Sequence, residues 1–95
     1  MKYFAAFQRM NNLEKNASCR QQHIDYLTKK ADEGKIFARG KFAGNEGGLV
    51  IYMAESLDEA KKLAESDPYV SSGARVLELY EWDMKVSRSV NGIRP

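Results

Sequence analysis

The centre of the chain reads K-I-F-A-R-G-K-F-A-G-N-E-G-G-L-V-I-Y-M-A, from Lys35 to Ala54. Two apolar runs flank the glycine-rich segment G-N-E-G-G, and both contain branched and aromatic side chains. Such side chains favour extended strands, and a short glycine-rich link between two strands is typical of a β-hairpin. The stretch therefore predicts two neighbouring antiparallel strands in the middle of the chain.

Helices are predicted on both sides of this hairpin. The first covers 17–33, because Ser18 with Gln21 fits a capping box and Gly34 stands where a C-terminal glycine is expected. The second covers 57–66 and opens with a stronger Ser-x-x-Glu capping box. An Asp-Pro pair then ends it, since the residue before a proline disfavours helical backbone.

Two outer strands complete the predicted order. They are K-Y-F-A-A-F-Q at 2–8 and A-R-V-L-E-L-Y-E-W at 74–82. The resulting order, β-α-β-β-α-β, predicts an α+β fold of the ferredoxin-like class, with a four-stranded antiparallel sheet and both helices on one side. We assign the domain to residues 1–84 and expect the polar tail at 85–95 to fray.

The predicted sheet is apolar on both faces. In the last strand two leucines alternate with valine, tyrosine and tryptophan, and the strand at 48–54 is apolar at nearly every position. Two helices cover only one face, and an exposed apolar face costs roughly 25 cal/mol per Å². We therefore expect a face-to-face homodimer, which forms a dimeric α+β barrel. The alternative is a monomer whose second face is a platform for a ligand.

Length and composition exclude several classes of protein. With 95 residues, of which 43% are hydrophobic and 29% charged, the chain is expected to fold as one soluble domain. Fifteen basic residues against 13 acidic ones indicate no basic surface for nucleic acid. No apolar run approaches the roughly 20 residues of a membrane span. Neither a signal peptide nor a cysteine pair is evident, so we expect a cytoplasmic protein.

The segment Cys19–Leu27 contains the only histidine of the chain. On a helix, Arg20 falls within the apolar stripe around Ile24, and His23 lies at the edge of that stripe beside Arg20. A guanidinium at a core-facing position indicates a polar pocket between helix and sheet, although near a helix start it can also extend into water. Histidine exchanges a proton near neutral pH, so His23 is a candidate acid or base. The alternative is an ordinary hydrogen-bonded imidazole.

Asp67 is the candidate partner of His23. A catalytic imidazole needs a carboxylate that sets its tautomer and stabilises its charged form, but Asp67 can also simply end a helix before Pro68. Other sites find less support. G-K-F-A-G-N-E-G-G lacks the spacing of a phosphate-binding loop, and Cys19 with His23 supplies too few ligands for zinc. Tyr52 alone does not make an RNA-binding platform. We therefore expect no cofactor, no metal and no nucleic acid.

Four motifs together carry a resemblance to a known family. They are Y-F-A-A-F at the start, R-x-x-H-x-x-Y-L from Arg20, E-G-K-I-F-A-R-G from Glu33, and D-P-Y-V-x-x-G-A from Asp67, with a final Y-E-W. Over about residues 1–84 the chain resembles the YCII-related (YciI-like) family. The resemblance implies a dimeric α+β barrel, related in architecture to muconolactone isomerases, with a histidine and aspartate pair in a cleft near the dimer interface.

The resemblance also implies roles for individual residues. His23 and Asp67 match the catalytic pair, and the substrate-binding positions are Arg20, Gly40, Tyr69 and Gly73. At least one relative eliminates chloride from a chlorinated hydroxyquinol. The chain departs from the family pattern after Gly40, where Lys41 replaces a frequent proline. Lys41 either attracts an anionic substrate or is a solvated hairpin lysine.

Two functions follow from these observations. The first is a cofactor-independent lyase or isomerase for a small hydroxylated or carboxylated metabolite, cyclic or aromatic, in which His23 moves a proton and Asp67 orients it. Arg20 then holds an anionic group or stabilises negative charge that develops on oxygen. The alternative is a domain that binds a small ligand without converting it, or that serves as a dimerising accessory module.

Overall fold

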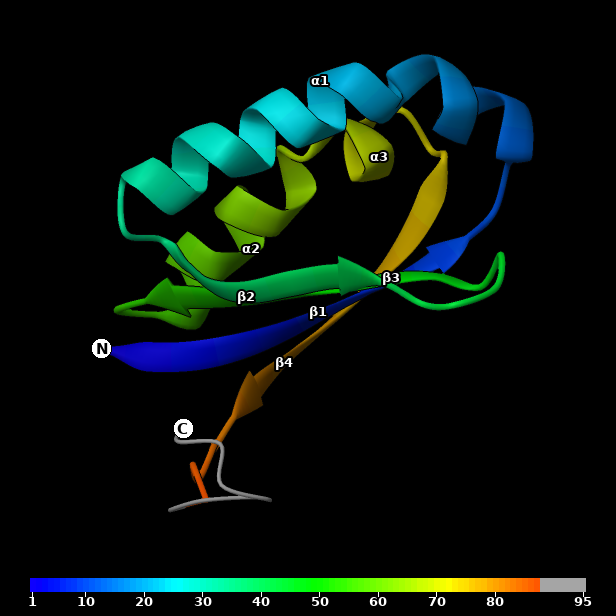
Figure 1. Ribbon diagram of the computed structural model, residues 1–95. Helices are drawn as coiled ribbons and strands as arrows, with labels where there is room; N and C mark the ends of the chain where they lie inside the picture. Colours follow the sequence, from blue (N-terminus) through cyan, green and yellow to red (C-terminus); the bar gives the residue numbers. More distant parts are fainter. Residues whose placement is uncertain (88–95) are drawn as a thin grey trace.

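Within residues 1–87, which the computed structural model describes, four strands form one antiparallel sheet in the order β2-β3-β1-β4 (Figure 1). The strands are β1 (Lys2–Met10), β2 (Ile36–Lys41), β3 (Gly47–Ala54) and β4 (Arg75–Trp82). The helices are α1 (Leu13–Asp32), α2 (Leu57–Glu65) and the single turn α3 (Pro68–Ser71). The predicted ferredoxin-like α+β fold is confirmed, with α3 added where the sequence predicted only a turn.

The core lies between the sheet and the helices, which all cover one face of it (Figure 1). β1 is central and pairs with β3 on one side and β4 on the other, in a register that sets Phe4 opposite Tyr52. Both aromatic side chains are completely buried. On α2 the two buried residues are alanines, Ala60 and Ala64, and their small side chains let that helix lie close to the sheet.

The predicted start of the first helix is wrong. α1 begins at Leu13, one turn before the predicted residue 17, and the side chain of Asn12 caps it by accepting a hydrogen bond from the backbone N–H of Lys15 at 2.9 Å. Ser18 lies inside the helix, where its hydroxyl donates to the carbonyl of Lys15. Asparagine is among the best N-cap residues, so the earlier cap extends the helix.

The other predicted helix ends agree with the structure. α1 ends in a Schellman motif: Gly34 has φ +76°, and the N–H of Lys35 donates to the carbonyl of Lys30 at 2.9 Å. At the start of α2, the Ser56 hydroxyl accepts from the N–H of Glu59 at 3.1 Å. These caps fix where the chain leaves each helix and enters the next element.

The face of the sheet opposite the helices is rich in exposed aromatic side chains. Phe7 is 40% exposed, Tyr80 54% and Trp82 45%, and Phe7 meets Tyr80 edge to face with ring centroids 6.3 Å apart. No helix within residues 1–87 covers this face (Figure 1). The sheet is therefore apolar on both sides, as the alternation in the last strand predicted.

The C-terminal tail and the length of the helices bear on two further predictions. Of the polar tail predicted to fray at 85–95, residues 85–87 have no regular secondary structure and the remainder lies outside the described residues. Among the helices described, none is long and apolar enough to cross a bilayer.

Gly34 tests the helix end, with Gly40 as its matched control. At both glycines the space around an added Cβ is empty to 4 Å, but only Gly34 has a positive φ. Because a left-handed conformation costs an L-residue about 1–2 kcal/mol, Gly34→Ala should lower the free energy of unfolding by that amount. Gly40→Ala should change it by less than about 0.5 kcal/mol. Urea denaturation of both variants measures the difference, and equal effects would contradict the assignment of the strain to φ.

Candidate active site

A cleft of about 390 Å³ opens between α1 and the sheet. Its size is typical of a small-molecule site. Side chains from α1, α3 and all four strands form its wall: Gln8, Arg20, His23, Ile24, Leu27, Arg39, Gly40, Lys41, Leu49, Val50, Tyr69 and Arg75. Segments from both halves of the chain therefore meet at one place.

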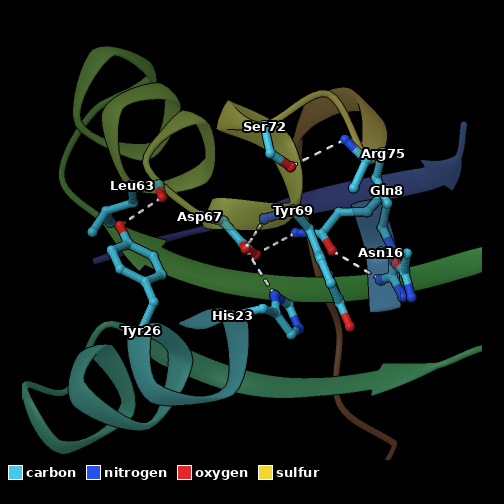
Figure 2. Close-up of polar contacts among 10 residues, drawn as sticks. Gln8, Asn16, His23, Tyr26, Leu63, Asp67, Tyr69, Ser72 and Arg75 are labelled. Carbon is cyan, nitrogen blue, oxygen red and sulfur yellow. Dashed lines mark hydrogen bonds and ion pairs between the residues drawn. The ribbon is translucent and has the colours of Figure 1, made fainter. Parts of the chain in front are cut away.

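His23 and Asp67, which are 44 residues apart in sequence, form a hydrogen bond in this cleft (Figure 2). His23 Nδ1 lies 2.7 Å from Asp67 Oδ1; the histidine side chain is 13% exposed and the aspartate side chain is fully buried. His23 projects from the middle of α1, and Asp67 is the N-cap of α3. The imidazole thus separates a buried carboxylate from the cleft.

The Asp-Pro pair explains why Asp67 sits there. Pro68 occupies the first turn of α3, where its missing N–H costs nothing, and Asp67 before it takes the extended conformation. Asp67 Oδ1 accepts a hydrogen bond from the N–H of Tyr69 at 2.9 Å. Asp67 therefore follows the end of α2, and its carboxylate both caps α3 and reaches His23.

A chain of hydrogen bonds continues behind Asp67 (Figure 2). Gln8, buried in β1, donates from Nε2 to Asp67 Oδ2 at 2.7 Å. Gln8 Oε1 accepts from Arg75 Nη1 at 3.1 Å, and Arg75 Nε donates to Asn16 Oδ1 at 2.9 Å. β1, β4 and the start of α1 are thereby connected to the histidine.

The direction of this chain sets the tautomer of His23. Arginine has no acceptor atom, so Gln8 must turn its oxygen to Arg75 and its NH₂ group to Asp67. Asp67 then accepts on both of its oxygens, and His23 Nδ1 carries the hydrogen that it donates. In the neutral imidazole the lone pair is therefore on Nε2, which does not contact Asp67, and His23 is one of the residues that line the cleft. Nε2 is the atom that can accept a proton from a bound molecule.

Tyr69 holds the imidazole from the other side. Its ring stacks on His23 with centroids 3.8 Å apart and an interplanar angle of 20°, and Arg75 Cζ lies 4.0 Å from the same ring centroid. Two planar groups cannot occupy one face of a ring at these distances, so Tyr69 lies between them. Cation–π contact and stacking add to the hydrogen bonds that fix His23. Burial lowers the pKa of Arg75, while the charge of Asp67 opposes that shift.

Two tyrosines, the buried Tyr52 and the partly buried Tyr26, lie close to the same carboxylate. Burial, and then the negative charge of Asp67, raises the pKa of the Tyr52 hydroxyl far above its usual range. Burial likewise raises the pKa of Tyr26, whose hydroxyl donates to the carbonyl of Leu63 at 2.8 Å (Figure 2). Both phenols therefore stay neutral near physiological pH, and neither competes with His23 for the exchange of a proton.

The structure brings together most of the residues that the sequence nominated. Arg20, His23, Gly40 and Tyr69 line the cleft, and Asp67 lies directly behind His23. Gly73 is not among the residues that line the cleft, and its role in substrate binding stays a prediction. It has φ +82° and follows α3, where only glycine turns the chain without strain into β4.

Three polar residues of the cleft wall were not nominated: Gln8, Arg39 and Arg75. Gln8 had a signal, because it is two and four positions from the core-facing Ala6 and Phe4 on the same strand face, and a polar residue on that face needs partners. No three histidine, cysteine or acidic side chains converge as metal ligands anywhere in residues 1–87.

Comparison with known proteins identifies the family. The family model of the YCII-related domain matches residues 1–83. The chain belongs to this family. Relatives of this YCII-related chain include protein YciI of Escherichia coli, 36% identical, and the uncharacterised protein YjpA of Bacillus subtilis, 33% identical. Each match covers 66% of this chain and 74% of the relative.

A solved structure has the same fold as this YCII-related chain. It is the 5-chloro-2-hydroxyhydroquinone dehydrochlorinase TftG of Burkholderia phenoliruptrix, in complex with 2,5-dihydroxybenzoquinone. The TM-score is 0.75 at 22% sequence identity, over 90% of this chain and 96% of the other. At this identity the likeness concerns the fold.

Gln8 tests whether the buried hydrogen-bond chain matters. Gln8→Met removes the partners of Asp67 Oδ2 and Arg75 Nη1 without a large change of volume, so it should lower the free energy of unfolding by about 2–4 kcal/mol. Gln21→Met is the matched control, since Gln21 also donates to an aspartate, Asp25, but on the exposed surface. It should cost less than about 0.5 kcal/mol. Thermal or urea unfolding compares the two variants. Similar losses would show that the buried hydrogen bonds of Gln8 contribute no more to the free energy of unfolding than an exposed hydrogen bond does.

Proposed function

We propose that this YCII-related protein is a small-molecule enzyme that moves a proton without a cofactor, as a lyase or an isomerase. The observation that carries the proposal is the 2.7 Å contact between His23 Nδ1 and the buried Asp67, which leaves Nε2 of this cleft-lining histidine free of Asp67. A base oriented by a carboxylate in this way is the arrangement that acid and base catalysis requires.

In the proposed reaction, His23 Nε2 removes a proton from a carbon next to an electron-withdrawing group of the substrate. The C–H bond breaks, its electron pair enters the substrate, and the new imidazolium is stabilised by Asp67. In a lyase the electron pair forms a double bond as a leaving group departs with its own bonding pair. In an isomerase His23 returns the proton to a different atom. Arg20 stabilises the negative charge that develops on a substrate oxygen.

The comparisons support the small-molecule part of this proposal. TftG is by its name a dehydrochlorinase, and its structure holds a small hydroxylated ring compound. We extend to this chain only the class of chemistry, removal of a proton from a small cyclic or hydroxylated molecule. A domain that merely retains such a molecule would share the cleft, so the test must detect conversion.

Hydrogen exchange tests the chemistry without knowledge of the product. The protein is incubated in D₂O with a panel of small cyclic hydroxy acids and keto acids, and deuterium uptake at carbon is followed by NMR. His23→Gln should slow the exchange by about 10²–10⁴-fold, the usual contribution of a general base. Gln22→Ala, at the exposed neighbouring position, should leave it unchanged. Unaltered exchange in His23→Gln would remove the histidine from the mechanism, and a ligand that is retained without exchange would indicate a binding protein.

We further propose that two copies pair through the sheet face opposite the helices, giving a dimeric α+β barrel. The aromatic residues on that face form an apolar surface that one copy leaves open, and a second copy presents the same surface to it. The cleft also has Leu49 of β3 in its wall, next to Ile51 and Phe7 of that face. Pairing would thus take place close to the candidate site.

Light scattering after size exclusion tests this pairing. The protein should elute with twice the mass of one chain, and Tyr80→Lys, at a position 54% exposed in the single copy, should elute as a monomer because it sets two charges in the interface. Leu57→Lys is the matched control: Leu57 is 51% exposed but lies on α2, on the helix side. A monomeric wild-type protein would disprove the pairing, as would dissociation by Leu57→Lys to the same extent.

A further inference from the structure

Positive charge surrounds the cleft almost without compensation. Four of its lining residues are cationic: Arg20, Arg39, Lys41 and Arg75. The first three form no ion pair with any residue in 1–87, and no acidic side chain is part of the cleft wall. The buried carboxylate of Asp67 already accepts hydrogen bonds from three other groups, and none of these cations is among them. The charges are therefore not explained by structural salt bridges.

A β-bulge in β2 aims two of these cations at the cleft. Ile36 pairs with Tyr52 on the helix-covered face, and strict alternation from Ile36 would send Arg39 and Lys41 to the opposite face. The register shifts between Ile36 and Ala38, so that Arg39 pairs with Val50 instead. A bulge reverses the alternation after it, and both cations turn toward α1.

The rest of the cleft divides into a polar and an apolar part. At the inner end, Arg75 is held by Gln8 and Asn16, and Gly48 leaves it room, since a Cβ there would lie 3.0 Å from Arg75 Nη1. Arg20, Arg39 and Lys41 are exposed at the mouth. Apolar side chains of α1 and β3 complete the wall: Ile24, Leu27, Leu49 and Val50.

This distribution matches a ligand with a charged end and an apolar body. Like charges that converge on one concave surface repel one another, and the field they create attracts anions. Arg39 and Lys41 lie two residues apart on one strand face, so their Cα atoms are about 7 Å apart, a spacing that lets both contact one oxyanion group.

We propose that the cleft binds a small organic anion, whose carboxylate or phosphate is held by Arg39 and Lys41 with Arg20 opposite, and whose apolar body lies between Ile24 and Val50 toward His23. The assignment rests on the proposed function only for the role of His23.

Titration with simple probes tests this site. Benzoate and phenyl phosphate are added to the protein at low and high salt, with neutral benzyl alcohol as the uncharged probe, and binding is followed by calorimetry and by NMR shifts of cleft residues. At least one anion should bind at the cleft, more weakly at high salt, and more tightly than the alcohol. Preference between the two anions identifies the charged group. Binding of the alcohol as tightly as both anions would overturn the proposal.

Two double variants distinguish an effect of the cations at the cleft from an effect of the net charge of the protein. Arg39→Gln with Lys41→Gln should weaken anion binding about tenfold or more, because contacts to charged groups are lost. Lys61→Gln with Lys62→Gln removes the same net charge from exposed positions of α2 and should leave binding nearly unchanged. Equal weakening by both pairs would refute a site at Arg39 and Lys41.

The same measurements separate this proposal from the proposed reaction. His23→Gln should retain anion binding, since the cations remain in place. Anion binding without any carbon exchange would refute the enzyme and support the site. Carbon exchange that is unaffected by the Arg39 and Lys41 substitutions would refute the site and support the enzyme.

Discussion

The buried carboxylate of Asp67 is the point on which the site depends. A charge removed from water is tolerated only where hydrogen bonds replace its hydration, and here α1, β1 and α3 each supply one donor. Those donors are His23, Gln8 and the backbone of Tyr69. The requirement to satisfy one anion therefore fixes how three elements meet. It also fixes the imidazole that separates this anion from the cleft.

The charges of the site are arranged in two layers. The negative group lies in the interior, behind the histidine, whereas the cations at the cleft mouth are exposed and have no partners within residues 1–87. Separation by the imidazole and by the ring of Tyr69 keeps Asp67 available to His23 and the cations available to a ligand.

The two faces of the sheet serve different purposes. The helix-covered face contains the core and the cleft, while the open face presents aromatic side chains such as Phe7 and Tyr80. β3 connects them, because Val50 and Leu49 point to opposite faces and both belong to the wall of the cleft. Only β3 therefore separates a contact made on the open face from the site.

The sequence by itself determined the fold, because alternation in the strands, helical caps such as Ser56 and glycine at position 34 are local signals that tertiary contacts do not override. It also nominated His23, Asp67 and Arg20, through spacing on a helix and a family resemblance. It placed the start of α1 one turn too late, because Ser18 with Gln21 resembles a capping box, whereas in the structure Asn12 caps the helix and Ser18 lies inside it. Only the tertiary structure decided the inward direction of Arg39 and Lys41, since a bulge is a property of strand pairing and reverses the alternation read from sequence. The connection from Gln8 through Asp67 to His23 likewise joins residues far apart in the chain, and no local pattern specifies that meeting.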